Sequence, residues 1–432
     1  MKYSTAFPLF LVAVTGCQTL TAVDTDFGDT SDTSEVTDTS DTEDTVDTQD
    51  TEDTADTEDT ADTADTQDTD DTGPIPDGCR ADPGSANKDR AIAINFNWAT
   101  GDNWTIYELD SAGDITEGDT FAMGNAYNQK VSFTPDGSLG LVAQDDGTLG
   151  IFTLDSNLNP TVVTQAWNDN GAFYASSVTI DPSGERAWVI DGNWENNGGG
   201  VYEIALDCDS GVPTLVGQTV SAKLPSDLVL QPDGSAFLFA EAIDGDDSAD
   251  VWWFDWLDEE YPWVQESVSL FENEDAMIGA GVRVDNVVLV ADNSFFSSDP
   301  NTVTFARISN DNLYAAGALE IDSPVDLIAS PYGDSVLVIQ DYDNAVRLLV
   351  PNGNNDVPFD DMGQPDYLVD EPELPGKSVV ITRGNLKGLV LVPEVTALHQ
   401  FQFDGNESIE DLGIFDFGSG DANIPTAIGV QP

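Results

Sequence analysis

The feature that most constrains the fold is a strand–turn–strand unit that recurs along the chain. In its clearest copy an apolar segment begins at Val131, Pro135-Asp136-Gly137 follows, and a second apolar segment contains Leu141. Proline fixes φ at the first corner of such a turn, and glycine tolerates the positive φ of the second corner. One such unit is compatible with many folds, so its recurrence at regular spacing is the informative property.

The spacing between copies predicts the fold class. Five copies carry a proline four residues after an apolar anchor, and two keep the strand–turn–strand pattern without it. The anchors are Val131, Val178, Leu228, Val282, Leu327, Val379 and Ile428. Steps of 45 to 54 residues match one four-stranded blade of a β-propeller.

The two ends of the folded region complement each other. The last anchor is followed by no second strand, whereas residues 90–97 match a second strand that lacks a first. Residues 104–110 and 120–124 would continue that blade as its third and fourth strands. We therefore expect an all-β, seven-bladed propeller within residues 79–432, in which the C-terminal strand closes the first blade and protects the sheet edges.

The turns allow a family resemblance to be named. Pro135-Asp136-Gly137-Ser138 and Pro232-Asp233-Gly234-Ser235 resemble the turns of bacterial seven-bladed YVTN and lactonase-like β-propellers, over about residues 90–432. The resemblance implies the propeller fold and offers lactone hydrolysis as one function. It identifies the fold better than the activity, because propellers carry many unrelated functions.

The N-terminus has the pattern of an export signal. Residues 1–16 contain Lys2, an apolar run and the small residues before Cys17, which resembles the signal peptide of a bacterial lipoprotein. This predicts that the Cys17 thiol carries lipid such as palmitate and anchors the protein to a membrane. Gln18 favours the outer membrane or cell surface by the sorting pattern of such lipoproteins. A plain secretory peptide with an incidental cysteine is the alternative.

Residues 17–78 predict a disordered acidic spacer. Asp-Thr pairs recur mostly every three residues, with 21 acidic residues and no basic one between Asp24 and Asp71. Few apolar residues are available to form a core, and like charges repel one another. We interpret the segment as a solvated linker; a functional stalk with O-glycans or loosely bound cations is the alternative.

Charge limits the partners of the whole chain. With 81 acidic and 13 basic residues the formal net charge is -68, which disfavours nucleic acid because its phosphates would be repelled. A protein or glycan partner is compatible with this charge. In an exported protein, Cys79 and Cys208 are expected to form a disulfide, with two separate thiols as the alternative.

Candidate ligand-binding residues lie where the innermost strands of the blades begin. Asp227 and Asp326 occupy matching positions in two blades, and Lys130 and Lys377 lie at the same level. Two carboxylates and two amines beside the channel would suit a cation or a polar ligand. The alternative, which we favour, is that each Asp bonds the backbone of the neighbouring blade.

Metal and catalytic signals are weak. Calcium is suggested by Asp244, Asp246 and Asp250, although their spacing is not that of an EF-hand, and solvated loop carboxylates are the favoured interpretation. The loop carrying Asp356, Asp360 and Asp361 is interpreted in the same way. The single histidine, His399, is placed in the third strand of the last blade, away from the channel, as a packed or surface residue.

The aromatic run Trp252-Trp253-Phe254, with Trp256 and Trp263, is expected to pack between sheets, with sugar stacking as the alternative. No nucleophile elbow, HExxH or phosphate loop occurs. We therefore predict a membrane-anchored, extracytoplasmic binding or scaffolding module without catalytic residues. A lactonase-like hydrolase working at the channel mouth remains the alternative.

Overall fold

Short apolar segments separated by turns fold here into β-strands only, as far as the described residues show. The computed structural model describes residues 90–96, 102–164, 174–192, 199–207, 211–240, 242–243, 249–256, 262–271, 278–292, 301–340, 345–363, 375–418 and 424–432. Within these ranges no helix could span a membrane. The expected signal peptide, the lipidated Cys17 and the acidic spacer lie outside the described residues.

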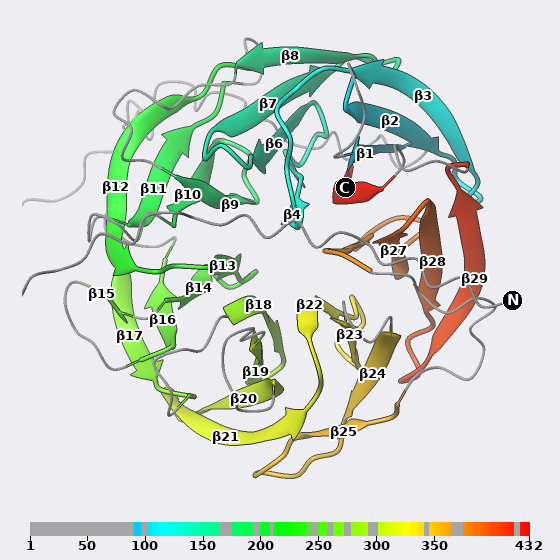
Figure 1. Cartoon of the computed structure of the whole chain (residues 1–432). Helices are drawn as coiled ribbons and strands as arrows, with labels where there is room; N and C mark the ends of the chain where they lie inside the picture. Colours follow the sequence, from blue (N-terminus) through cyan, green and yellow to red (C-terminus); the bar gives the residue numbers. More distant parts are fainter. Residues whose placement is uncertain are drawn as a thin grey trace, which may run out of the picture. The chain divides into compact units, whose positions relative to one another are not determined.

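Seven sheets surround a common axis, which makes the fold a seven-bladed β-propeller (Figure 1). From the innermost strand outward, the first four blades are β30 (Pro425–Val430), β1 (Arg90–Phe96), β2 (Trp104–Leu109) and β3 (Ile115–Phe121); β5 (Ser132–Phe133), β6 (Leu139–Ala143), β7 (Leu149–Leu154) and β8 (Pro160–Thr164); β9 (Ala175–Ile180), β10 (Arg186–Asp191), β11 (Gly200–Ala205) and β12 (Thr214–Lys223); β13 (Asp227–Leu230), β14 (Ser235–Phe239), β16 (Val251–Asp255) and β17 (Trp263–Val268). The last three are β18 (Ile278–Val284), β19 (Val287–Asp292), β20 (Thr302–Ser309) and β21 (Asn312–Glu320); β22 (Pro324–Ala329), β23 (Val336–Gln340), β24 (Ala345–Pro351) and β25 (Phe359–Asp361); β26 (Val379–Val380), β27 (Leu389–Glu394), β28 (Ala397–Phe403) and β29 (Ile409–Asp416). We number these blades 1 to 7.

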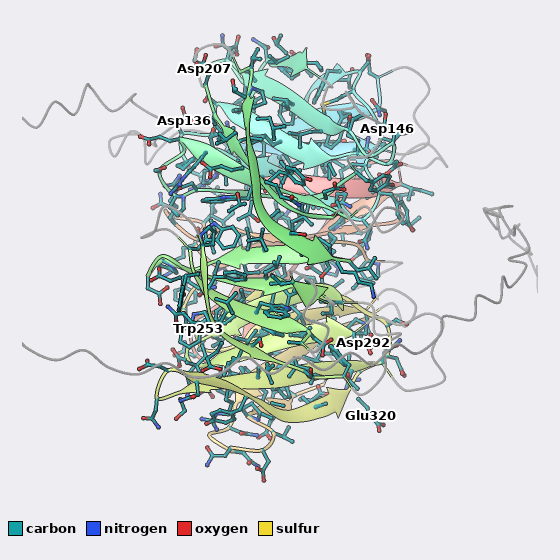
Figure 2. The ribbon with its side chains drawn as sticks, turned by 90° about the vertical axis from the view of Figure 1, so that its left-hand side faces the viewer. Asp136, Asp146, Asp207, Trp253, Asp292 and Glu320 are labelled. Carbon is teal, nitrogen blue, oxygen red and sulfur yellow. The ribbon has the colours of Figure 1, made fainter. Side chains whose placement is uncertain are left out.

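The hydrophobic core is distributed over the seams between blades. Seven clusters of buried apolar side chains each join two neighbouring blades. On β14, Leu238 packs with Trp188 of blade 3, whereas the next residue, Phe239, packs with Val290 of blade 5. Alternate side chains of a strand point to opposite faces of its sheet, so each blade contributes to two seams. Seen from the side, side chains fill the space between the strands (Figure 2).

The C-terminal strand closes the ring as the sequence predicts. β30 pairs antiparallel with β1, placing Ile428 opposite Ile94. The buried Thr426 hydroxyl donates to the Asn95 side-chain oxygen at 2.7 Å and fixes this pairing. Blade 1 is thus built from both ends of the folded region, and its inner edge is covered.

The predicted turn chemistry is also present. Gly137 and Gly234 have φ of +72° and +86°, values that favour glycine. The Asp136 and Asp233 carboxylates accept the backbone N–H groups of Ser138 and Ser235, at 3.0 and 3.1 Å. Aspartate at this position therefore stabilises the turn, and its recurrence is a property of the fold.

Two strand assignments need correction. The fourth strand of blade 1 is β3 at Ile115–Phe121, earlier than the expected residues 120–124. The Asp110 carboxylate accepts the N–H groups of Ala112 and Asp114, so the turn is short and the strand resumes sooner. All residues of β3 between its two ends are exposed, and the strand therefore lacks the apolar pattern that would reveal it.

The second correction concerns Lys130, which belongs to a different sheet from the one expected. Gln129–Lys130 forms β4, which pairs in parallel with β30 of blade 1, and only β5 begins blade 2. The pairing aligns Ile428 with Lys130. The segment that connects blade 1 to blade 2 therefore passes beside the axis as β4 before the chain enters blade 2 at β5 (Figure 1).

Candidate functional site

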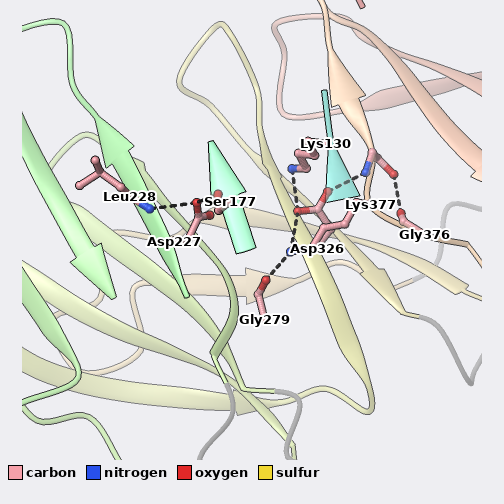
Figure 3. Close-up of polar contacts among 9 residues, drawn as sticks. Lys130, Ser177, Asp227, Leu228, Gly279, Asp326, Gly376 and Lys377 are labelled. Carbon is pink, nitrogen blue, oxygen red and sulfur yellow. Dashed lines mark hydrogen bonds and ion pairs between the residues drawn. The ribbon is translucent and has the colours of Figure 1, made fainter. Parts of the chain in front are cut away.

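The four predicted axial residues start from different blades and lie near one end of the innermost strands (Figure 3). Lys130 is on β4, Asp227 begins β13, Asp326 is the third residue of β22, and Lys377 precedes β26. We call these four residues the axial cluster. The repeat brings them together because each occupies nearly the same position in its own unit.

Asp326 is the centre of the axial cluster. Its side chain is fully buried, at 0% exposure, and one oxygen accepts from the Lys130 amine at 2.8 Å. The other oxygen accepts the backbone N–H of Ser378 in blade 7 at 2.8 Å. A buried carboxylate needs both a countercharge and hydrogen bonds, and these contacts supply both to Asp326.

Lys377 contributes a second amine. Its Nζ lies 4.0 Å from the same Asp326 oxygen and donates to the Gly279 carbonyl of β18, in blade 5. Burial lowers the pKa of Lys377; Asp326 raises it, Lys130 lowers it and Asp227 raises it, and the net result is a lowered pKa. The lysine side chain is largely buried, with 14% of its surface exposed.

Asp227 supplies an acceptor with spare capacity. One of its oxygens accepts from the Ser177 hydroxyl at 3.2 Å and from the Leu228 N–H at 2.9 Å. The other oxygen accepts no hydrogen bond from the described residues. Asp227 therefore presents a carboxylate oxygen that a donor group of a ligand could use.

The structural interpretation of the aspartates applies to Asp326, and the ligand-binding interpretation stays a prediction. Asp326 does bond the backbone of the neighbouring blade, as the structural interpretation requires. It also holds two amines that retain unused N–H groups, since each ammonium has three donors. Asp227 bonds the Ser177 side chain of its neighbour, not that blade's backbone.

Sequence reasoning missed two partners of the cluster: the Gly279 carbonyl and the Ser177 hydroxyl as a donor. Ser177 and Ser378 precede their anchors, so the repeat does place them at this level. Gly279 carries no side-chain signal, and its carbonyl is reached because Lys377 extends past blade 6 to blade 5.

Among the described residues, no group of three acidic, histidine or cysteine side chains is arranged to hold a metal ion. Asp250 instead accepts the N–H groups of Leu270 and Phe271, at 2.6 and 3.0 Å. Asp244 and Asp246 lie outside the described residues, as do Cys79 and Cys208.

The second acidic loop also has other roles. Asp361 pairs with Arg347, and Asp360 accepts from the Asn352 amide at 2.7 Å. Asp356 uses its backbone carbonyl to accept the Gly317 N–H. The Asp360 and Asp361 carboxylates thus have partners within their own blade.

The aromatic run splits into two environments. Trp252, Trp253, Phe254 and Trp256 are buried, as the packing interpretation expects. Trp263 is 68% exposed, so its expected burial is wrong. It begins β17, the outermost strand of blade 4, and no further strand lies beyond β17 in that sheet.

His399 lies in β28, the third strand of blade 7, and is fully buried. Its Nδ1 lies 2.7 Å from Glu394 Oε1, and its Nε2 lies 2.9 Å from Asp411 Oδ1. The Phe401 ring stacks on it with centroids 4.2 Å apart. Burial alone would lower the pKa of His399, but the bonds and charges of the two carboxylates raise it. His399 therefore bridges Glu394 of β27 and Asp411 of β29 inside blade 7.

Comparison with known proteins gives the fold and no closer relationship. No family model matches the sequence, and no curated protein matches it. A Bacteroides fragilis protein proposed to be a 6-phosphogluconolactonase is 10% identical with TM-score 0.53, covering 81% of this chain and 99% of its own. The periplasmic gluconolactonase of Pseudomonas aeruginosa is 12% identical with TM-score 0.53, covering 80% and 99%.

These likenesses define the class: the chain is a seven-bladed β-propeller similar in fold to lactonase structures. At such low identity the likeness concerns the fold alone, and activity has to be argued from the site.

Proposed function

We propose that the propeller is a binding module that takes a small polar ligand at the axial cluster. The observation that carries the proposal is the convergence of the Lys130 and Lys377 amines on the buried Asp326. Asp326 fixes the two amines, and their remaining N–H groups are the donors available to a ligand. Asp227, with its unused oxygen, is the acceptor.

The ligand class follows from this arrangement. Two ammonium groups suit a carboxylate or several hydroxyl oxygens, and one carboxylate suits an amine or a hydroxyl. The ligand would therefore carry both acceptors and donors, as a polyol or a zwitterion does. It would be free in solution or the end group of a glycan or protein partner.

The module would work outside the cytoplasm on a lipid anchor at Cys17, at the outer membrane or cell surface. The support is sequence alone: an apolar run followed by Val14-Thr15-Gly16-Cys17. Metabolic labelling with palmitate should tag the wild type and leave Cys17→Ser untagged. Equal labelling of the two proteins would refute the anchor.

Hydrolysis of a cyclic ester is the second candidate, favoured by the lowered pKa of Lys377. A neutral Lys377 amine could take a proton from water as the water oxygen attacks the ester carbonyl carbon. The bond between the carbonyl carbon and the ring oxygen would then break, and the Lys377 ammonium would return the proton to the leaving oxygen. Lys130 would stabilise the negative charge that develops on the carbonyl oxygen.

Turnover separates the two candidates. A binding module should bind its ligand without consuming lactones, and Asp227→Asn should weaken binding while the fold is kept. A hydrolase should release acid from simple lactones at a rate that falls in Lys377→Met. Acid release that is equal in wild type and Lys377→Met would exclude Lys377 as the base.

A further inference from the structure

A second group of positively charged side chains lies at the end of the innermost strands opposite to the axial cluster. Lys377 precedes β26, whereas Arg383 follows it, in the turn that leads to β27. Arg383 is exposed, and its guanidinium donates to the Pro135 carbonyl in blade 2 at 2.7 Å. The turn of blade 7 therefore reaches past the closing blade to the turn of blade 2.

Arg90, the first residue of β1, contacts Arg383. Its guanidinium donates to the carbonyl of Arg383 at 3.1 Å and to the carbonyl of Gln431 at 3.0 Å. The Gln431 amide in turn donates to the Gly137 carbonyl at 2.5 Å. Two arginines are thus held side by side by backbone carbonyls from three blades, at the place where the ring is closed.

Neither guanidinium forms an ion pair with a carboxylate among the described residues. This contrasts with Arg186, Arg283 and Arg347, each of which pairs with an aspartate. The acidic residue of the contacted turn, Asp136, binds the Ser138 hydroxyl with both oxygens. In a chain with 81 acidic and 13 basic residues, two neighbouring arginines with no acidic partner among the described residues are unexpected.

The two positive charges act on each other. Burial, followed by the charge of Arg383, lowers the pKa of Arg90. Two like charges held together repel one another, and an anion bound between them would relieve that repulsion. The backbone carbonyls use three N–H groups of the pair, while each guanidinium has five donors, so several donors remain for a ligand.

We propose that Arg90 and Arg383 form a binding site for a phosphate- or sulfate-type oxyanion at this end of the axis. Guanidinium groups bind such oxygens through paired, charge-assisted hydrogen bonds. Two guanidinium groups match the charge of a dianion better than that of a single carboxylate. The site is independent of the axial cluster, because Lys130 and Lys377 lie at the other end of the innermost strands.

The test is calorimetric titration of the whole mature protein with inorganic phosphate at constant ionic strength, with acetate in a parallel titration. Arg383→Gln should weaken phosphate binding at least about tenfold, since it removes hydrogen bonds to a charged group. Arg283→Gln, which removes a paired arginine, and Lys377→Met should bind phosphate as the wild type does. Acetate should bind more weakly than phosphate.

Wild-type binding that survives in Arg383→Gln, or no phosphate binding by the wild type, would overturn the proposal. Acetate binding as tight as phosphate would overturn the assignment to a dianion. Should Arg383→Gln fail to fold, as judged by circular dichroism, wild-type crystals soaked in phosphate give the answer. Density between the two guanidinium groups supports the site, and a clear map without it refutes the site.

Discussion

Lys130 and Asp326 are 196 residues apart in sequence, yet their side chains meet at 2.8 Å beside the propeller axis. Lys130 comes from a two-residue strand added to blade 1, and Asp326 comes from blade 6. The contact therefore joins blades that are not neighbours in the ring. It stabilises the axis, and in the proposed function it also holds the Lys130 amine in place for a ligand.

Removing the Asp326 carboxylate should lower the free energy of unfolding substantially. In Asp326→Ala the Lys377 amine, only 14% exposed, loses its acidic partner, and the Ser378 N–H loses its acceptor. Breaking a buried pair from one side costs about 3–5 kcal/mol. Urea unfolding monitored by tryptophan fluorescence should show that loss. Lys130→Met should cost less because Lys130 is 37% exposed; a larger loss for Lys130→Met than for Asp326→Ala would contradict this account.

The pKa of Lys377 should report how far its amine is buried. Burial and the neighbouring Lys130 charge together hold its pKa below the ordinary lysine value of 10.5. After reductive methylation with ¹³C-labelled formaldehyde, the NMR signal that disappears in Lys377→Arg should titrate at lower pH than the other lysine signals. A signal that titrates with the bulk of the lysines would show that the amine is solvated.

The bridge from Glu394 through His399 to Asp411 in blade 7 predicts a pH-dependent stability. Because Glu394 and Asp411 raise the pKa of His399 in the folded state, its stabilising contribution is complete below the ordinary pKa of about 6.5. That contribution is lost as the pH rises through the raised folded value. The free energy of unfolding of the wild type should fall over this interval, and His399→Gln should lack the fall. Parallel pH profiles for the two proteins would contradict the assignment.

The seam between blades 4 and 5 should be intolerant of added volume. A Cβ on Gly281 would lie 2.1 Å from the ring of the buried Phe239. Gly281→Ala should therefore destabilise the fold by about 1–3 kcal/mol, the usual cost of overpacking. The double variant with Phe239→Leu should recover part of that loss, because the two positions share the same space. Strictly additive losses would show that the ring is not the obstacle.

The repeat made most of the fold predictable. Apolar anchors and turns such as Pro135-Asp136-Gly137 reveal the blades because each blade has to satisfy the same local geometry. The strand β3 escaped prediction because its middle residues are exposed and polar. The parallel strand β4 has only two residues, too few to show a pattern.

The same contrast applies to the candidate site. The positions of Lys130, Asp227, Asp326 and Lys377 beside the axis were predictable because each lies one or two residues before the anchor of its repeat. The partners of His399 could be expected from strand register, since Val392 pairs with His399 and Glu394 lies two residues further on, on the same face. The Arg90 and Arg383 pair was not predictable, because ring closure brings together residues that are 293 positions apart.

The central claim is that the amines of the axial cluster bind a ligand. Thermal unfolding of the wild type, Lys377→Met and the distant control Arg186→Met in a panel of amino acids, polyols and sugar acids tests it directly. We predict that at least one compound raises the unfolding midpoint of the wild type and of Arg186→Met and leaves Lys377→Met unchanged. A panel that stabilises none of the proteins, or stabilises all three equally, would contradict the claim.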